Sequence, residues 1–136
     1  MTTAVDTSIL LDVFIPDPLF GVSSRRLIED CFSQGPLIIS PEVYAELLPH
    51  FRDTSPLDEA LLSLGIQVVP TDLRVAEQAG HAWLGYRQAG GSRSRILTDF
   101  MIAAHALVHA DCLATRDQGF YRRHFPALRV RAPDET

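Results

Sequence analysis

Short apolar runs alternate with longer stretches of helical periodicity along this chain of 136 residues. The short runs are bounded by glycine, proline or polar residues and have the length of buried strands. The longer stretches repeat apolar residues at i, i+3, i+4 and i+7, the pattern of a helix that buries one face. We expect strands at residues 2–5, 37–39, 66–69, 112–115 and 128–131, and helices at residues 9–14, 23–32, 41–51, 56–64, 72–88 and 98–107.

Capping signals mark two of the expected helix starts. Ser40 suits an N-cap because Pro41 follows it at the first helical position, and Thr98 is expected to cap the helix after it. Strands that are separated by helices pair in parallel through crossover connections. The predicted fold is α/β, a three-layer α/β/α sandwich with a mainly parallel sheet of about five strands. Residues 1–136 are expected to form a single domain.

The composition fits a globular protein. Apolar residues make up 46% of the chain and charged residues 21%, close to the average for soluble domains. No apolar run approaches the roughly 20 residues of a membrane span, and the first residues lack the basic start and apolar centre of a signal peptide. We therefore expect a cytoplasmic protein that does not interact with membranes. Cys31 and Cys112 are far apart and are expected to be reduced thiols, not zinc ligands.

Charge is distributed unevenly along the chain. Residues 1–86 hold 4 arginines and 12 acidic residues, whereas residues 87–136 hold 8 arginines and 5 acidic residues. Every basic side chain is arginine, whose planar group of donors suits phosphate. The net charge of −5 therefore does not exclude a nucleic acid as partner. Charge alone does not decide the function.

Three aspartates stand where a parallel α/β fold places its ligand site. Asp6 and Asp117 each lie just past an expected strand, and open parallel sheets bind ligands at the carboxyl ends of their strands. If the first and fourth strands are neighbours, they lie about 4.8 Å apart, so the two carboxylates can share one metal ion. Asp99 falls in the first turn of its helix, where an acid also simply stabilises the helix start. Its position alone leaves both roles open.

Two glutamates share the helix expected at residues 41–51. Helical spacing places Glu46 near the rim of the apolar face and Glu42 toward solvent, so Glu46 is the better candidate for a cleft. Clustered carboxylates repel one another unless a cation lies among them. A site made of oxygen ligands suits Mg²⁺, with Mn²⁺ as a substitute. Such ions promote the hydrolysis of phosphodiesters.

Four segments carry these acids in a characteristic order. They are residues 5–8, 41–47, 95–107 and 113–120. Their residues resemble the motifs of the PIN-domain nucleases, and especially of the VapC toxins of bacterial toxin–antitoxin pairs. The resemblance runs over almost the whole chain, from Val5 to about Val130.

The resemblance has implications for activity and partners. It implies an Mg²⁺-dependent endoribonuclease that hydrolyses RNA phosphodiester bonds, a cognate VapB-like antitoxin, and commonly a homodimer. It also implies a catalytic site whose acids are Asp6, Glu46, Asp99 and Asp117. The three aspartates are then the metal ligands, and Glu46 completes the site or orients the attacking water.

Two hydroxyl side chains stand close to the acids in sequence. Ser8 follows Asp6, where it either supports the site or caps the helix that starts there. Thr115 precedes Asp117 by two residues, and it is either a site hydroxyl or an ordinary threonine at a strand end. Both residues are kept as supporting candidates.

Two arginines and two histidines are also candidates for binding. Arg95 and Arg116 lie near the acids and are expected to contact RNA phosphates; the alternatives are a solvated basic face or contacts with an acidic stretch of antitoxin. His105 and His109 have the i, i+4 spacing of zinc ligands. No third ligand motif accompanies them, so they are expected to face solvent from their helix.

Three other functions compete with the toxin. The enzyme could act without an antitoxin, for example in RNA maturation, and a neighbouring gene for a small DNA-binding protein would favour the toxin. A non-catalytic binding module with the same fold would be expected to have lost at least one acid. A regulatory domain with a phosphate-accepting aspartate lacks a lysine partner, because the chain contains no lysine.

Overall fold

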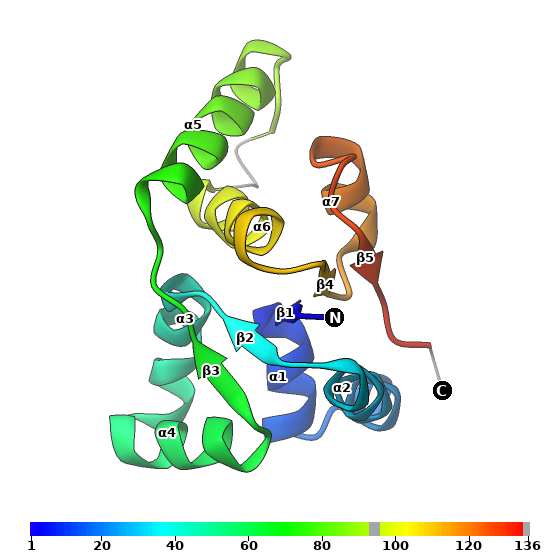
Figure 1. Cartoon of the computed structure of the whole chain (residues 1–136). Helices are drawn as coiled ribbons and strands as arrows, with labels where there is room; N and C mark the ends of the chain where they lie inside the picture. Colours follow the sequence, from blue (N-terminus) through cyan, green and yellow to red (C-terminus); the bar gives the residue numbers. More distant parts are fainter. Residues whose placement is uncertain (93–95, 135–136) are drawn as a thin grey trace.

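A parallel sheet of five strands forms the middle layer of the computed structural model, which describes residues 1–92 and 96–134 (Figure 1). The strands are β1 (Thr3–Val5), β2 (Leu37–Ile39), β3 (Ile66–Val68), β4 (Cys112–Ala114) and β5 (Val130–Arg131). Their order is β3-β2-β1-β4-β5, and the pairings between neighbours are parallel. All five lie within the ranges expected from the sequence.

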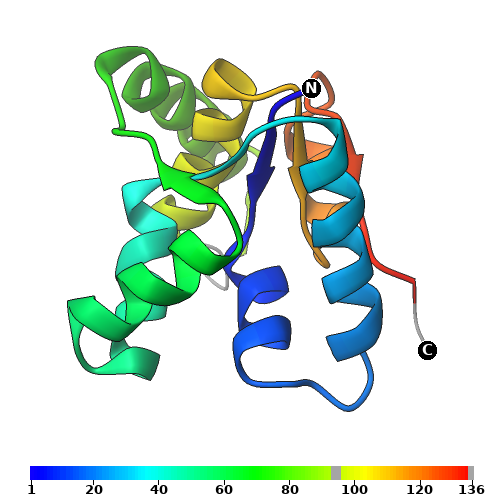
Figure 2. The same ribbon diagram turned by 60° about the horizontal axis from the view of Figure 1, so that its bottom comes forward.

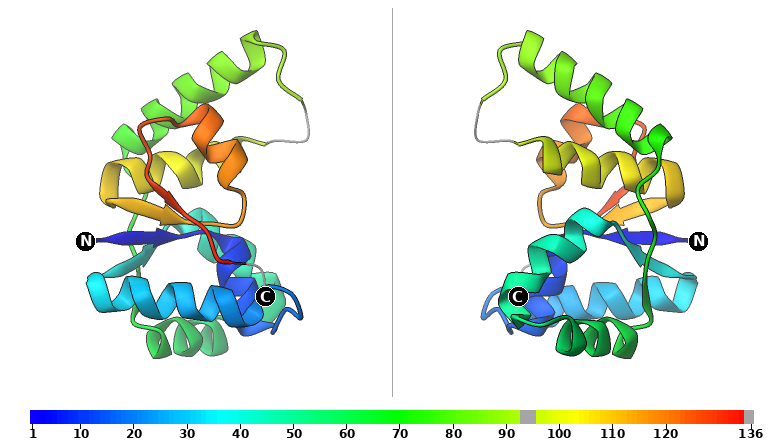
Figure 3. Two further views of the ribbon diagram at one scale, coloured as in Figure 1. Left: turned by 90° about the vertical axis from the view of Figure 1, so that its right-hand side faces the viewer. Right: turned by 90° about the vertical axis from the view of Figure 1, so that its left-hand side faces the viewer.

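Helices form the two outer layers. On one side of the sheet lie α1 (Thr7–Phe14), α2 (Gly21–Gln34) and α4 (Thr54–Ser63). On the other side lie α5 (Leu73–Gln88), α6 (Leu97–His109) and α7 (Gln118–His124), as both views in Figure 3 show. The remaining helix, α3 (Pro41–Phe51), contacts both α1 and α6. The predicted three-layer α/β/α fold is confirmed.

The strand order reverses at β1, which lies between β2 and β4. Ala4 is in register with Leu113 of β4, and the Asp6 amide donates to the Ala114 carbonyl at 2.9 Å. Figure 2 shows β1 and β4 running side by side, with α1 starting where β1 ends. The predicted adjacency of the first and fourth strands is therefore confirmed, and the residues that follow both strands meet at the carboxyl edge of the sheet, at the topological switch point.

Helix caps explain several of the boundaries. Ser40 Oγ accepts the Val43 amide, with Pro41 at the first helical position, as expected. The expectation for α6 was wrong, because this helix starts at Leu97 and Thr98 lies inside its first turn. Its N-cap residue is Ile96, and Asp99 in the first turn accepts the Ile96 amide through Oδ2 at 3.1 Å. Asp99 therefore does stabilise a helix start, which also fixes the direction of its carboxylate.

An aromatic cluster holds the α5–α7 layer together. Phe100 is fully buried, and the rings of Trp83, Phe120 and Phe125 pack against it at centroid distances of 5.2, 5.4 and 5.8 Å. These rings come from all three helices of the layer and from the residue that ends α7. Because Phe100 follows Asp99 directly, the cluster also fixes the start of α6 beneath the site.

The two α6 histidines do not face solvent, contrary to expectation. His105 is 1% exposed, and its Nε2 lies 2.8 Å from the Val69 carbonyl oxygen. His109 is half-buried, with Nε2 3.1 Å from Asp72 Oδ2. Burial lowers the pKa of His105. Both rings therefore tie α6 to the segment that follows β3.

Two features expected from composition can be checked directly. Cys31 and Cys112 are buried and unpaired, as expected of structural thiols. Cys112 Sγ lies 3.3 Å from Thr3 Oγ1 across β1 and β4. Within residues 1–92 and 96–134, none of the helices combines the length and apolarity that crossing a membrane requires.

Candidate active site

The four predicted acids line one open pocket of about 350 Å³. Asp6 follows β1 and is the N-cap of α1, and Asp117 follows β4 and precedes α7. Asp99 comes from the first turn of α6, and Glu46 comes from the middle of α3. The fold therefore brings together carboxylates from four separate stretches of the chain.

Asp6 is the most enclosed of the four acids, at 8% exposure. Its Oδ1 accepts the Thr7 amide at 2.8 Å, and its Oδ2 accepts the hydroxyl of Thr115 at 2.7 Å. Burial raises the pKa of Asp6 to about 6; the two hydrogen bonds oppose this shift, and the charge of Glu46 adds to it. The protein alone therefore does not fully stabilise a negative charge at this position.

Tyr121 is a member of the site that sequence analysis did not identify. Its hydroxyl is buried in the pocket wall and donates to Asp6 Oδ2 at 3.4 Å. Burial raises the pKa of Tyr121 far above its usual value, and the charges of Asp6, Asp99 and Asp117 raise it further. The phenol therefore remains a hydrogen-bond donor, and three of the acids lie within electrostatic reach of this one oxygen.

Glu46 projects into the pocket from α3 and is held by Thr7. The Thr7 hydroxyl donates to Glu46 Oε1 at 2.6 Å, which fixes the direction of an otherwise exposed carboxylate. Glu42 was expected to point to solvent, and this was wrong. It is half-buried and accepts the Thr71 hydroxyl at 2.8 Å, and it is not among the residues that line the pocket.

The segment from Thr115 to Asp117 joins two of the acids. The Thr115 hydroxyl donates to Asp6 and accepts the Asp117 amide at 3.0 Å. Ser8 Oγ accepts the Arg116 amide at 3.5 Å. Both hydroxyls that were singled out in the sequence thus contact the site or the chain that carries it.

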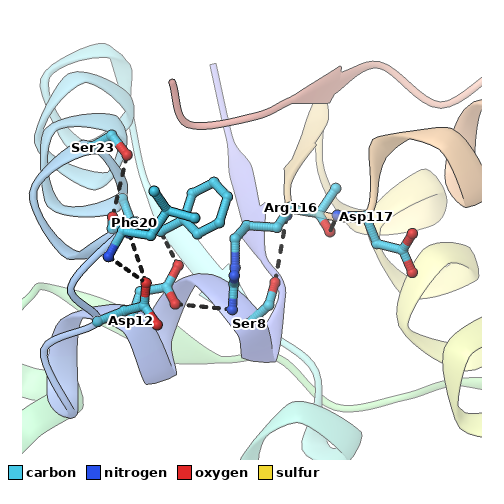
Figure 4. Close-up of polar contacts among 10 residues, drawn as sticks. Ser8, Asp12, Phe20, Ser23, Arg116 and Asp117 are labelled. Carbon is cyan, nitrogen blue, oxygen red and sulfur yellow. Dashed lines mark hydrogen bonds and ion pairs between the residues drawn. The ribbon is translucent and has the colours of Figure 1, made fainter. Parts of the chain in front are cut away.

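The two candidate arginines differ in what the structure shows. Arg95 lies outside the described residues. Arg116 borders the pocket, but its guanidinium turns away from Asp117 toward Asp12 and Phe20 (Figure 4). The expectation that these arginines contact RNA remains a prediction.

The donor set of the pocket fits a hard divalent cation. The described residues that line it include four carboxylates and no histidine or cysteine, and such oxygen ligands are typical of Mg²⁺ and Mn²⁺ sites. Within the part of the chain that the structure describes, no three His, Cys, Asp or Glu side chains are close enough to form a finished metal-binding group. The acids therefore surround the pocket instead of converging on one point. Burial, with the charge of Glu46, raises the pKa of Asp6, so a positive charge beside Asp6 would favour its carboxylate form.

Thr115→Val is expected to raise the pKa of Asp6 above about 6, because the Thr115 hydrogen bond is the largest influence that lowers it. A titration of the Asp6 carboxyl carbon by NMR measures this change. Affinity for Mn²⁺ at neutral pH is expected to fall about tenfold, since an oriented carboxylate binds metal better. Thr3→Val is the matched control, because Thr3 is an equally buried strand threonine that contacts Cys112 instead. An unchanged titration would contradict this role of Thr115.

Thr7 and Tyr121 left only weak signals in the sequence. Thr7 stands between Asp6 and Ser8, and nothing in that order distinguishes which hydroxyl reaches a distant glutamate. Tyr121 follows Asp117 by four residues, the spacing that brings side chains together on one helix face. The spacing can be read from the sequence, but it indicates that Tyr121 lies on the same side as Asp117 only if a helix begins at residue 118, as it does in the structure.

Comparison with solved structures shows the same architecture. The toxin–antitoxin proteins VapBC2 from Rickettsia felis, bound to a promoter DNA fragment, include a chain that matches with TM-score 0.78 and 22% identity, covering 98% of this chain and 100% of that one. VapBC-1 from nontypeable Haemophilus influenzae matches with TM-score 0.74 and 21% identity, covering 97% and 98%. A toxin–antitoxin complex from Klebsiella pneumoniae gives 0.72 and 20%, covering 98% and 99%. At these identities the likeness establishes the fold.

Sequence comparison establishes the family. No curated protein sequence matches the chain significantly. The family model of the PIN domain matches residues 3–126, which include all four acids and nearly the whole fold. This chain therefore belongs to the PIN domain family.

Proposed function

We propose that this protein is an Mg²⁺-dependent endoribonuclease, with Mn²⁺ as a substitute ion, that hydrolyses RNA phosphodiester bonds. The observation that carries the proposal is the meeting of Asp6, Glu46, Asp99 and Asp117 in one pocket at the switch point of the sheet. Membership of the PIN domain family supports a nuclease, and the motif resemblance supports RNA as the substrate.

The three aspartates are the residues that would hold the cation. A bound divalent ion supplies the positive charge that activates water and stabilises the oxygen leaving phosphorus. Asp6 is held on both oxygens, by Thr7 on one side and Thr115 on the other. These two hydrogen bonds already fix the direction of the Asp6 carboxylate, so binding a cation would cost little side-chain entropy.

Glu46 would orient the attacking water, and Tyr121 would support the carboxylate of Asp6. Glu46 would accept a hydrogen bond from that water, and the bond from Thr7 to its carboxylate at the pocket supports this role. Tyr121 remains protonated and donates to Asp6, so it supports the charged carboxylate without taking its place.

The reaction is an in-line displacement at phosphorus. The oxygen of water bonds to phosphorus while the bond to the leaving ribose oxygen breaks. The attacking water loses one proton to solvent, and its oxygen stays in the terminal phosphate of one RNA fragment. The leaving ribose oxygen takes up one proton from solvent and becomes the hydroxyl of the other fragment.

We extend the proposal to a biological role as the toxin of a VapBC-type pair. Chains of VapBC complexes from Rickettsia felis and Haemophilus influenzae share this fold along nearly their full length. A VapB-like antitoxin is then the protein partner, and the toxin is expected to form a homodimer. A neighbouring gene for a small DNA-binding protein would support this role.

Purified protein incubated with total RNA is expected to cleave it only when a divalent cation is present. Parallel reactions contain Mg²⁺, Mn²⁺, or Mg²⁺ with excess chelator, and sequencing of the new ends identifies the cut positions. Cleavage at a few positions that disappears with chelator is the expected result. Equal cleavage in chelator would contradict a metal-dependent nuclease, and a lack of cleavage with both ions would contradict the proposed activity.

A further inference from the structure

A buried carboxylate lies next to the pocket and is not one of its four acids. Asp12 is on α1 and is 2% exposed. Its Oδ1 lies 3.1 Å from Arg116 Nη2, and its Oδ2 accepts the Ser24 hydroxyl at 2.6 Å. A carboxylate is buried only at high cost unless such partners surround it. Asp12, which Ser24 holds in place, is therefore a specific partner for the Arg116 guanidinium.

Arg116 is held from a second direction by Phe20. Its guanidinium carbon lies 4.5 Å from the centre of the Phe20 ring, which is the arrangement of a cation–π contact. Asp17 Oδ2 accepts the amides of Leu19 and Phe20, so the loop that presents this ring is itself braced. The Arg116 side chain is consequently clamped between α1 and the start of α2 (Figure 4).

The contacts of Arg116 with Asp12 and Phe20 hold the backbone segment that carries Asp117. Arg116 precedes Asp117 directly, and the two side chains extend in opposite directions (Figure 4). Other attachments of this segment include Thr115 to Asp6, the Asp117 amide to Thr115, the Arg116 amide to Ser8, and the Thr115 amide to the Arg131 carbonyl. Anchoring the Arg116 side chain fixes the backbone from which the Asp117 carboxylate enters the pocket.

An ion pair whose carboxylate is buried, as Asp12 is, stabilises a fold only weakly, because apolar residues of similar volume often do so equally well. Its distinctive property is that it fixes one arrangement, since the planar guanidinium satisfies its partners in few orientations. That property is useful beside a pocket whose acids, among the described residues, do not form a group of three or more that could hold a metal ion.

We infer that the Asp12–Arg116 ion pair, stacked on Phe20, positions Asp117 and thereby sets the affinity of the pocket for a divalent cation. Arg116 is on this view a positioning residue whose main contact is Asp12, not an RNA phosphate. The inference rests on the proposed function, because it assumes that Asp117 is a ligand.

Asp12→Asn tests the inference, because it removes the charge and keeps the volume. The affinity for Mn²⁺, read by the electron paramagnetic resonance of free Mn²⁺, is expected to fall about tenfold or more. Hydrogen exchange of the Asp117 amide in metal-free protein is expected to accelerate, since its backbone loses an anchor. In RNA cleavage assays at a fixed Mg²⁺ concentration, Asp12→Asn is expected to lower kcat and to leave KM for RNA unchanged.

Two further variants separate positioning from general stability. Leu61→Ala, in helix α4, which contributes no residue to the described pocket lining, lowers stability by opening a cavity in the core, and it is expected to leave Mn²⁺ affinity unchanged. The double variant Asp12→Asn with Arg116→Met removes both charges of the pair, so Arg116 is not left without its carboxylate partner. It is expected to bind Mn²⁺ as weakly as Asp12→Asn alone.

Each outcome of these measurements supports or overturns the inference. If wild-type protein binds Mn²⁺ and Asp12→Asn binds it equally well, the inference is overturned and the proposed function stands. If Arg116→Met raises KM for RNA while Asp12→Asn has no effect, Arg116 is a phosphate contact and the inference is again overturned. If wild-type protein binds no Mn²⁺, the proposed function and the inference are both overturned. Weaker Mn²⁺ binding in Asp12→Asn but not in Leu61→Ala supports the inference.

Discussion

Replacing Asp6 with asparagine is expected to slow RNA cleavage about a thousandfold, which corresponds to about 4 kcal/mol of transition-state stabilisation. Asp6 is held by hydrogen bonds to both of its carboxylate oxygens. Asparagine has nearly the same shape but no charge, so it packs in place of aspartate and binds a divalent cation poorly. Single-turnover cleavage of one RNA at saturating Mg²⁺ measures the loss.

The matched control for this substitution is Glu42→Gln. Glu42 is a half-buried acid that, like Asp6, has a threonine hydroxyl partner, but it does not line the pocket. Its variant is expected to cleave RNA at close to the wild-type rate. Full activity in Asp6→Asn would contradict the assignment of Asp6, and an equal loss in Glu42→Gln would show that cleavage responds to carboxylate loss in general.

The meeting of Asp6 and Asp117 was predictable because a short strand fixes the position of the few residues that follow it. Thr3–Val5 and Cys112–Ala114 are bounded so closely that their ends could be placed within a residue or two. In a parallel sheet both ends lie at the same edge, so Asp6 and Asp117 had to be near each other once the strands were neighbours. The neighbour relation itself came from the expected fold and not from any local pattern.

The residues that support the acids were not predictable, because their contacts join distant parts of the chain. Asp12 lies on α1 among Ile9, Leu10 and Val13, all of which are buried. A charged residue on such a helix indicates an exposed edge when read locally. Its burial makes sense only with Arg116 beside it, and the sequence does not show that pairing.

The α6 histidines were misplaced for a related reason. Helical periodicity assumes one buried face and one exposed face. Consecutive residues from Ile102 to Ala106 are buried in this helix, because it is enclosed by α5, the sheet and α3. His105 is therefore inside, where its contact with the Val69 carbonyl satisfies the ring.

Asp6 should also make the stability of the metal-free protein depend on pH. Its pKa is raised from 3.8 to about 6, so the folded state binds this proton more tightly than the unfolded state does. The stabilisation from the protonated form is complete below pH about 4 and is lost as pH rises through about 6. The expected loss from this group is about 3 kcal/mol in the free energy of unfolding.

Comparing wild-type protein with Asp6→Asn isolates this effect, because the other carboxyl groups titrate in both. Urea unfolding in chelator at several pH values between 4 and 7 is expected to show the asparagine variant gaining stability relative to wild type as pH rises. A relative stability that does not change with pH would contradict the raised pKa. Adding Mg²⁺ at pH 7 should stabilise wild type but not the variant, because only the Asp6 carboxylate of the wild type has a negative charge for the cation to neutralise. Below pH about 6 the same binding must displace a proton, so the Mg²⁺ concentration needed for stabilisation should rise as pH falls.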